Sequence, residues 1–443
     1  MTAKAFSNAR ERLFGRHIEA LTRETERALA QTGFDRLLIH SGHSRPRFQD
    51  DNHPPFRAHP YFVHWLPLPQ QADSLLEIAP GARPRLWLCS PDDYWHAAPP
   101  EPEGWWAEHF EVESVAEPEA WLHALAERRA SALIGDRADF TTLGEHAELD
   151  PPALLQQLDE ARTLKTDWQI ACMAEANRRA LAGHRAAAEA FAGGGSELDI
   201  HLAYLAAAGA DSESMPYNNI VALNEHCAVL HYQRREAARP DGHRSFLIDA
   251  GADVYGLAAD VTRTHAAGPG LFADLVAAMD ELQQRLAARM QTGRSYVDLH
   301  FEAHRGVADL LHRFGVCRMT IDAMLEAGLT RTFLPHGLGH FLGVQVHDVA
   351  GRVAPDGCAL PPPKGHAALR LTRRLESGNV LTVEPGLYFI PSLLAELRDS
   401  PLSAQVDWDV VDELLPFGGV RIEDNVVVAP ETPRNLTREA EAG

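Results

Sequence analysis

The pattern of apolar and polar residues in the first third of the chain predicts helices alternating with short strands. Residues Ser7–Gln31 show the charge-laced periodicity of a helix. Short apolar runs predict strands at Arg36–His40, Arg85–Cys89 and Ser131–Ile134. Because helix-like segments separate these runs, we expect a small α/β domain at residues 1–160.

The same reading predicts a second α/β (α+β) domain at residues 161–443. An Ala-rich helix is expected at Thr166–Phe191, and the sequence Ser196–Asp199 has the signature of a capping box that begins the next helix. Strands are expected at Asn219–Leu223 and Cys227–Tyr232, and amphipathic helices are expected at Leu271–Met290 and Ser295–Phe314.

The functional interpretation begins with residues Leu247–His265. Two apolar runs, ending at Asp249 and Asp260, flank a turn-rich centre, which predicts a β-hairpin with a bulged or longer turn. Acidic residues form strands poorly, and buried carboxylates are usually paired or bound to a metal ion. Two solvated turn aspartates would be the simpler interpretation of this segment alone.

Two glutamates occupy similar positions later in the chain. Glu384 follows the apolar run Leu381–Val383, and Glu423 follows Val420–Ile422, so both carboxylates stand where a strand pattern predicts burial. One such acid is usually a satisfied core residue, whereas four together with histidines are better explained by bound cations. Four carboxylates and one imidazole suit a pair of Mn²⁺, Co²⁺ or similar ions, which can share and deprotonate a water molecule.

Spacing alone leaves the histidine ligand open. His336 and His340 are four residues apart, as on a metal-binding helix, but Gly337 and Gly339 disfavour a helix. Each histidine could equally be a hydrogen-bonded residue behind the ligands.

Composition narrows the classes of function. The 443 residues are 45% hydrophobic and 23% charged, as in a soluble globular protein of two or three domains. The formal net charge of −21 disfavours a nucleic-acid partner and an anionic membrane surface. Five scattered cysteines without a CxxC indicate neither a disulfide framework nor a thiolate zinc site. The sequence shows no apolar signal region or long apolar run, so we expect a cytoplasmic protein without a membrane segment.

Taken together, the motifs resemble those of the Xaa-Pro dipeptidases (prolidases) of the pita-bread metallopeptidase family. That family also includes aminopeptidase P, methionine aminopeptidase and the metal-free creatinases. The resemblance lies, in the family's order, in YNNIVALNEHCAVLHY, LIDAGADVYGLAADVTRTH, HGLGHFLGVQVHD, LTVEPG and GVRIEDN. It implies a pita-bread catalytic domain at residues 161–443. The segments SGHSRPRFQDD and PDDYWH are similar to the bacterial prolidase form, in which residues 1–160 would dimerise and cap the active site.

The resemblance also implies a ligand set for two divalent ions, with Mn²⁺ expected. His340 is implied rather than His336, because the family's ligand lies seven residues before the histidine of the VHD element, here His347. Asp260 and Glu423 would bridge the ions. The five implied ligands are Asp249, Asp260, His340, Glu384 and Glu423.

Further roles follow from the same resemblance. Glu384 would also be the general base, and His231 and His347 would polarise the scissile carbonyl. Arg421 would orient a ligand carboxylate from behind. Arg370 would clamp the carboxylate that ends the dipeptide. The remaining residues implied in substrate binding are Tyr217, Trp95 and His336.

Two alternatives to a prolidase remain. Aminopeptidase P would release an N-terminal residue before proline from longer peptides, and a non-catalytic relative would use the same fold for binding. A dipeptidase could also hydrolyse organophosphorus compounds as a side activity. We expect a homodimer in which the loop at Gln49–Asp51 reaches the partner. The aromatic side chains around this loop need cover that a small domain alone does not give.

Overall fold

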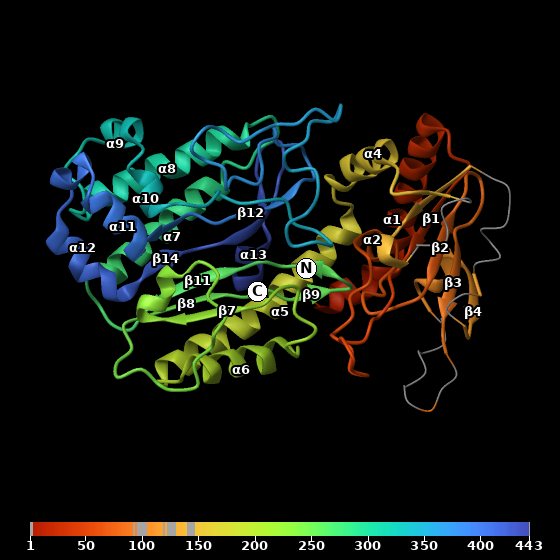
Figure 1. Ribbon diagram of the computed structural model, residues 1–443, viewed down its shortest axis with the longest axis horizontal. Helices are drawn as coiled ribbons and strands as arrows, with labels where there is room; N and C mark the ends of the chain where they lie inside the picture. The colour runs from red at the N-terminus through yellow and green to blue at the C-terminus, as the bar shows by residue number, and fades with distance from the viewer. Residues whose placement is uncertain are drawn as a thin grey trace. The chain divides into compact units, whose positions relative to one another are not determined.

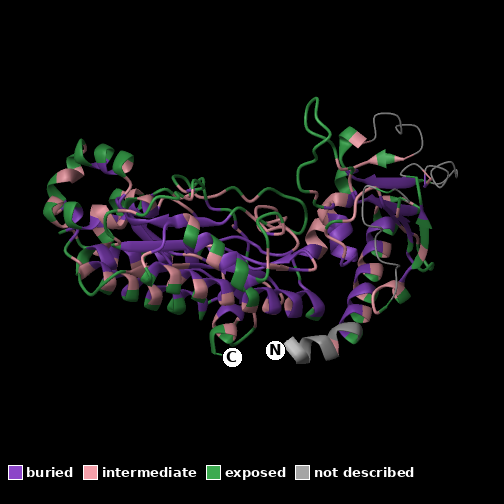
Figure 2. Ribbon diagram, turned by 90° about the horizontal axis from the view of Figure 1, so that it is seen from below, coloured by how far each residue is buried: buried purple, intermediate pink, exposed green. Residues whose placement is uncertain are grey.

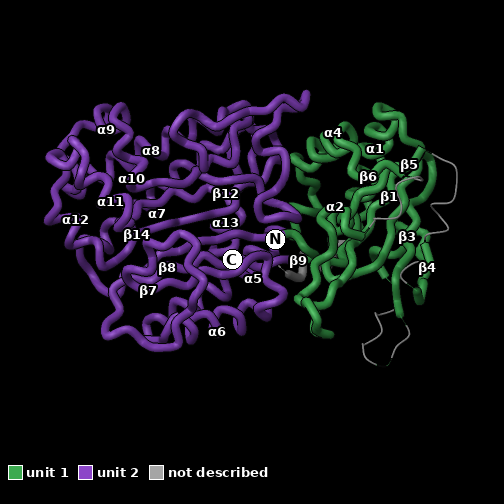
Figure 3. Tube along the Cα trace, in the orientation of Figure 1, with its two compact units in different colours: residues 1–172, 255–257 green, residues 173–254, 258–443 purple. Residues whose placement is uncertain are grey.

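The computed structural model describes residues 3–91, 94, 104–117, 120–121, 130–139 and 147–442. The chain divides into two compact units, residues 1–172 with 255–257 and residues 173–254 with 258–443 (Figure 3). Both units mix helices and strands, which confirms the predicted α/β (α+β) class. Among the described residues, none of the helices combines the length and the apolar character needed to cross a membrane.

The first unit contains a mixed six-stranded sheet in the order β4-β3-β2-β1-β5-β6 (Figure 1). The three strands predicted from apolar runs form at the predicted residues, and β1 pairs in parallel with β5 and antiparallel with β2. The strands are β1 (Arg36–His40), β2 (Leu75–Ile78), β3 (Arg85–Cys89), β4 (Glu111–Val115), β5 (Ser131–Ile134) and β6 (Glu148–Leu149). The helices are α1 (Ala3–Thr32), α2 (Pro60–Trp65) and α4 (Pro152–Arg162), followed by α5 (Asp167–Ala192), which continues into the second unit.

The second unit surrounds several small antiparallel sheets with helices. Helix α7 packs against β11, β12 and β14, α8 packs on α7, and α6 packs on β7 (Figure 1). The helices are α6 (Glu197–Ala208), α7 (Leu271–Ala287), α8 (Tyr296–Arg313), α9 (Ile321–Ala327), α10 (Thr330–Phe333), α11 (Pro391–Arg398), α12 (Trp408–Leu414) and α13 (Leu436–Ala442). The strands are β7 (Ile220–Leu223), β8 (Ser245–Asp249), β9 (Asp253–Val254), β10 (Leu257–Ala258), β11 (Thr262–Ala266), β12 (Val380–Val383), β13 (Gly386–Tyr388), β14 (Gly419–Arg421), β15 (Asp424–Val427) and β16 (Arg434–Asn435).

The largest core of this unit lies between the helix pair α7–α8 and the strands beneath it. Met279, Leu299, Leu381 and Val426 are fully buried there. Figure 2 shows the strands buried along most of their length, while the surrounding helices turn one side toward solvent. This core gives the strands that carry the acidic residues a rigid support.

The predicted hairpin at Leu247–His265 forms with different arms. Asp249 ends β8 and pairs with Thr262, so the second arm is β11 rather than the run before Asp260. The residues between them form the short strands β9 and β10, and Asp260 lies just before β11. Apolar runs alone do not distinguish these registers, because both place apolar side chains in the core.

The strand predicted at Cys227–Tyr232 is wrong. A 3₁₀ helix occupies Asn224–Ala228, followed by a turn. Asn224 has a φ of 56°, and its side-chain oxygen accepts hydrogen bonds from the backbone N–H groups of Arg244 and Ser245. These side-chain bonds replace strand pairing and turn the chain.

The capping box at the start of α6 provides a test of this local structure. Ser196 Oγ accepts from the Asp199 N–H, and the Asp199 carboxylate accepts from the Ser196 N–H. We expect Ser196→Ala to lower the free energy of unfolding by about 1 kcal/mol, measured by urea denaturation. Ser212→Ala, at an exposed turn residue, is the control and should have no effect. Equal stabilities of the two variants would contradict the capping role.

Candidate metal centre

The β8–β11 pairing positions the two aspartates of the candidate centre. Tyr217 donates to both, at 2.9 Å to Asp249 Oδ1 and 2.5 Å to Asp260 Oδ1. Asn425 fixes the backbone of Asp260, because its Oδ1 accepts from the Asp260 N–H and its amide donates to the Asp260 carbonyl. The two carboxylates therefore face the same space through shared hydrogen bonds.

The two glutamates lie opposite each other where two antiparallel strand pairs join. Glu384 lies between β12 and β13, and Glu423 lies between β14 and β15. Val383 pairs with Asp424, the residue after Glu423, and Glu423 also forms a bridge with Thr262 at the start of β11. This bridge joins the strands of the aspartates to those of the glutamates.

An extended segment beside β12 brings His340 to the acids. The Thr382 N–H donates to the His340 carbonyl, and the next bond along the chain joins the Glu384 N–H to the Leu338 carbonyl. His340 Nε2 lies 3.5 Å from Asp260 Oδ2 and 3.7 Å from Glu384 Oε1. A Cβ at Gly339 would approach the Thr382 carbonyl oxygen to 2.2 Å, so this close pairing requires glycine.

The two candidate histidines have different surroundings. His340 Nδ1 bonds the Phe341 carbonyl at 2.9 Å, which holds a proton on Nδ1, so Nε2, which faces the acids, is the nitrogen that can bind a metal ion once it is deprotonated. His336 instead bonds the Tyr388 hydroxyl through Nε2, at 2.8 Å, and its Nδ1 lies 3.7 Å from Glu384 Oε2. The orientation of His340 is that of a metal ligand, whereas His336 borders the cluster.

Arg421 and Thr262 support the carboxylates from behind. Arg421 Nη2 donates to Asp249 Oδ2 at 2.7 Å, and its Nη1 donates to the Tyr388 hydroxyl at 2.9 Å. The Thr262 hydroxyl donates to Glu423 Oε2 at 2.7 Å. Pattern reasoning did not single out Thr262, Tyr388 or Asn425. Thr262 follows Asp260 by two residues, and Asn425 follows Glu423 by two, a spacing that places residues on the same face of a strand. This spacing was the signal in the sequence that could have found Thr262 and Asn425.

Burial strongly affects the charge of this cluster. Asp260 and Glu423 are buried, and Asp249 and Glu384 are half-buried. Burial raises the pKa of Glu384 to about 7. Burial and the neighbouring carboxylates also raise the pKa of Glu423 well above its ordinary range, and burial raises that of Asp249 despite the opposing charge of Arg421.

Asp260 and His340 behave as a pair within this cluster. Burial alone would raise the pKa of Asp260, but the hydrogen bond and charge of His340 bring it below its ordinary value. The pKa of His340 is raised, because Asp260 and Glu384 outweigh the opposing effect of burial.

The residues of this cluster fit a pair of divalent cations. Ligand atoms of Asp260, His340 and Glu423 lie within 4.8 Å of one another, with Glu384 beside His340 and Asp249 sharing Tyr217 with Asp260. Three of these carboxylates, Asp249, Glu384 and Glu423, have raised pKa values, and the ion pair of Arg421 is with Asp249, so further positive charge is needed to keep the group ionised.

The residues predicted to bind substrate differ in how closely they approach the carboxylate cluster. The rings of His347 and His340 have centroids 4.4 Å apart. Partial burial, followed by the charges of His340 and Arg370, lowers the pKa of His347 to about 4. His231 is exposed. Trp95 lies outside the described residues.

Tyr217, predicted to bind substrate, also contacts the carboxylates. Its hydroxyl lies on two carboxylates, so the ring is oriented by the metal centre itself rather than placed only as a pocket wall. Its half-buried ring also packs near Gly251, where a Cβ would come within 2.8 Å of it.

Comparison with known proteins identifies the family. A model described as metallopeptidase family M24 matches residues 171–430, and one described as the N-terminal domain of Xaa-Pro dipeptidase matches residues 12–159. The chain belongs to metallopeptidase family M24, which confirms the resemblance and the class of enzyme.

Relatives match nearly the whole chain. The Xaa-Pro dipeptidase of Pseudoalteromonas atlantica is 44% identical and covers 96% of this chain and 98% of its own. That of Xanthomonas campestris pv. campestris is 44% identical over 96% of this chain and 97% of its own. The low-pH form of aminopeptidase P from E. coli has a TM-score of 0.75 at 23% identity, covering 98% and 97% of the two chains, which supports the pita-bread fold.

The contacts of Arg421 generate a prediction. We expect Arg421→Met to weaken metal binding roughly 10–100-fold, because Asp249 loses the donor that orients it. Calorimetric titration of metal-free protein with Mn²⁺ measures this change. Arg398→Met removes an exposed arginine paired with Asp412 and is the matched control, which should bind as the wild type does. Unchanged affinity in Arg421→Met would show that Asp249 needs no such support.

Proposed function

We propose that the protein is an Xaa-Pro dipeptidase that uses two divalent metal ions. The observation that carries the proposal is the convergence of four carboxylates and His340 in one cluster of an M24 metallopeptidase chain. The relatives named Xaa-Pro dipeptidase, and the matching N-terminal domain, support this substrate class over others in the family.

We propose that Asp249, Asp260, His340, Glu384 and Glu423 would hold the two metal ions. An oxygen-rich donor set with one imidazole favours Mn²⁺ among the available ions. When bound, such a pair acidifies a water molecule and polarises the substrate carbonyl. The tertiary amide before proline lacks an N–H, and this combination suits its hydrolysis.

The chain's own residues would handle protons and charge. Glu384 stands beside His340 at the cluster and is placed to accept the proton of the attacking water and to deliver it to the leaving nitrogen. His347, whose lowered pKa keeps it neutral at pH 7, can donate a hydrogen bond to the developing oxyanion. His231 would act from the opposite side, and His336 would line the pocket with Tyr388.

Arg370 would select dipeptides by binding the carboxylate that follows proline. Arg370 is exposed, and its charge is one of the effects that lower the pKa of His347. A guanidinium at this place gives bidentate contacts to a free carboxylate but not to a continuing peptide. Trp95 and Tyr217 are the further residues proposed to contact the substrate.

Two alternatives differ in testable ways. Aminopeptidase P activity would prefer longer peptides. A non-catalytic binding module would not need all five ligands, and the clustering of these residues argues against it. Organophosphorus hydrolysis is a proposed side activity, since an activated water could attack phosphorus as well as carbon.

We expect Arg370→Ala to raise the KM for Gly-Pro about 10–150-fold, because one charge-assisted bidentate contact is lost. Discrimination against Gly-Pro-NH₂, which lacks the carboxylate, should weaken at the same time. Initial rates on Gly-Pro, its amide and a proline-containing tripeptide, with Mn²⁺, Co²⁺ or Zn²⁺ returned to metal-free protein, provide the measurement.

Arg374→Ala is the matched control, since this neighbouring arginine is exposed and bonds the Gly293 carbonyl. Its kinetics should equal those of the wild type. If Arg370→Ala leaves dipeptide and amide kinetics unchanged, or if the wild type prefers the tripeptide, aminopeptidase P becomes the better assignment.

We further propose a cytoplasmic homodimer in which the first unit contributes contacts. Phe48, beside the Gln49–Asp51 turn, has 92% of its surface exposed. In contrast to the expectation, Tyr61, Phe62 and Trp65 are already buried within one chain and Phe56 is half-buried. Phe48 is therefore the exposed aromatic side chain of this group that a partner would cover. Light scattering should give the mass of a dimer, and Phe48→Ser should weaken it. A fully active monomer would exclude this arrangement.

A further inference from the structure

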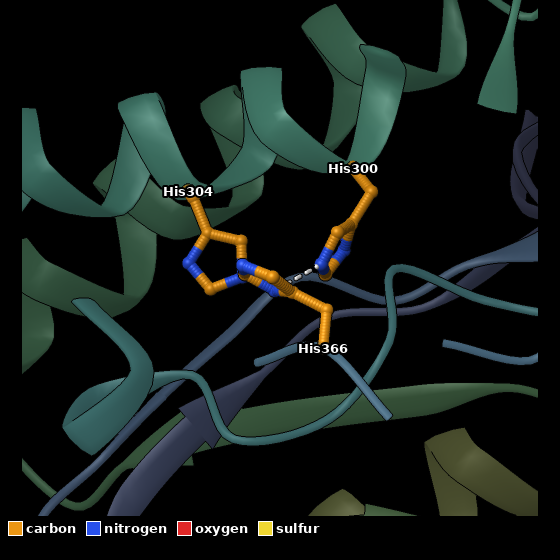
Figure 4. A group of neighbouring side chains, drawn as sticks. All are labelled: His300, His304 and His366. Atoms are coloured by element: carbon orange, nitrogen blue, oxygen red, sulfur yellow. Dashed lines mark hydrogen bonds between the residues drawn. The ribbon is translucent and has the colours of Figure 1, made fainter. Parts of the chain in front are cut away.

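Three histidines outside the carboxylate centre converge on one point of the second unit (Figure 4). His300 and His304 lie four residues apart on α8 and point from the same side of the helix. His366 meets them from the end of the Pro/Gly-rich segment at residues 353–366. One nitrogen from each ring lies within 4.8 Å of the other two.

The hydrogen bonds of the cluster leave ligand nitrogens facing one another. His304 Nδ1 bonds the Thr330 hydroxyl at 2.9 Å, while its Nε2 is buried without a partner in the described part of the chain. His300 Nε2 lies 2.8 Å from His366 Nδ1. His300 and His304 are each only 1% exposed, so solvent water does not supply a hydrogen-bond partner for His304 Nε2.

The three rings are neutral, and a metal ion would replace the proton shared between His300 Nε2 and His366 Nδ1. Burial and the neighbouring imidazoles lower the pKa of His300 to about 2 and that of His304 to about 3. Burial and the charge of Arg331 lower the pKa of His366. Neutral imidazoles retain the lone pairs that bind metal ions.

Two arginine side chains near the cluster, Arg331 and Arg305, oppose a bound cation. The guanidinium of Arg331 packs against Gly328 and Gly365, where added Cβ atoms would meet it at 2.2 and 2.1 Å. Both arginines line a cavity of about 390 Å³ beside His304 and His366, and Arg305 is paired with Asp322. Three acidic side chains line the same cavity. They are Asp298, Glu302 and Glu326.

We propose that His300, His304 and His366 bind one Zn²⁺, or a similar ion that prefers imidazole, at a site separate from the carboxylate centre. Three nitrogen donors favour Zn²⁺, Cu²⁺ or Ni²⁺ over Mn²⁺, so the two sites would select different ions. Thr330 would act behind the site by holding the proton of His304 on Nδ1.

The geometry needs only small movements. Nitrogens on a tetrahedral Zn²⁺, each about 2.0–2.1 Å from the ion, lie roughly 3.3 Å apart. The rings of His300 and His366 must therefore separate by a few tenths of an ångström, and His304 must approach. A fourth position would face the cavity. The ion would tie the end of the loop that precedes Arg370 to helix α8.

Metal analysis of protein whose carboxylate centre is saturated with Mn²⁺ tests the proposal. After equilibration with Zn²⁺, the wild type should hold one more Zn²⁺ per chain than His366→Gln, which alters the half-buried member of the cluster. His312→Gln changes an exposed histidine on the same helix and should retain the wild-type zinc content. Thr330→Val should bind Zn²⁺ on the order of 10–100-fold more weakly.

X-ray absorption at the zinc edge on the wild type avoids any effect of substitution on folding. With one equivalent of Zn²⁺, the spectrum should show imidazole scattering from three ligands. An oxygen-dominated shell, or equal zinc contents in wild type and His366→Gln, would overturn the site. Both readouts count or describe bound metal and do not depend on peptide turnover.

Discussion

The candidate metal centre depends on one constraint, which is that four carboxylates are held close together in a largely water-excluded space. Burial opposes the ionisation of each, and the carboxylates repel one another, so the pKa values of Asp249, Glu384 and Glu423 are raised, while His340 lowers that of Asp260. Arg421 compensates one of them through Asp249. The family assignment and the donor set together explain the arrangement, since two divalent ions would supply the remaining positive charge.

The fold meets this constraint through strand pairing rather than through one loop. The bridge between Thr262 and Glu423 joins the two acid-bearing strand pairs, and the segment of His340 pairs with β12. Backbone and amide hydrogen bonds, such as those of Asn425 to Asp260, then fix each carboxylate before any ion binds. The candidate ligands are therefore held in place by elements that are distant in sequence.

The acids in apolar strands could be recognised from the sequence because a charged residue breaks an otherwise buried pattern. Strand and helix positions such as β1, β3 and α5 followed from the same periodicity. The pairing register of β8 with β11 could not be predicted from this pattern, since two pairings bury equally apolar faces. Nor could the 3₁₀ turn after Asn224, which depends on side-chain hydrogen bonds to residues some twenty positions later.

The choice between His336 and His340 shows the same limit. Spacing left both open, and the resemblance alone favoured His340. In the structure, the carbonyl of Phe341 orients His340 toward Asp260, while Tyr388 engages His336. Such partners arise from tertiary packing, so local pattern cannot reveal them. The three-histidine cluster was likewise invisible, because His366 joins α8 only through the folded loop.

The central claim is that divalent cations take the place of protons on the carboxylate cluster. Calorimetric titration of metal-free protein with Mn²⁺ at pH 7, in buffers of different ionisation enthalpy, measures how many protons are released on binding. Because the pKa of Glu384 is raised to about 7 and that of Glu423 is raised well above its ordinary range, protons should be released, and fewer as the pH rises above 7. Mn²⁺ binding whose observed enthalpy is the same in every buffer would contradict this account.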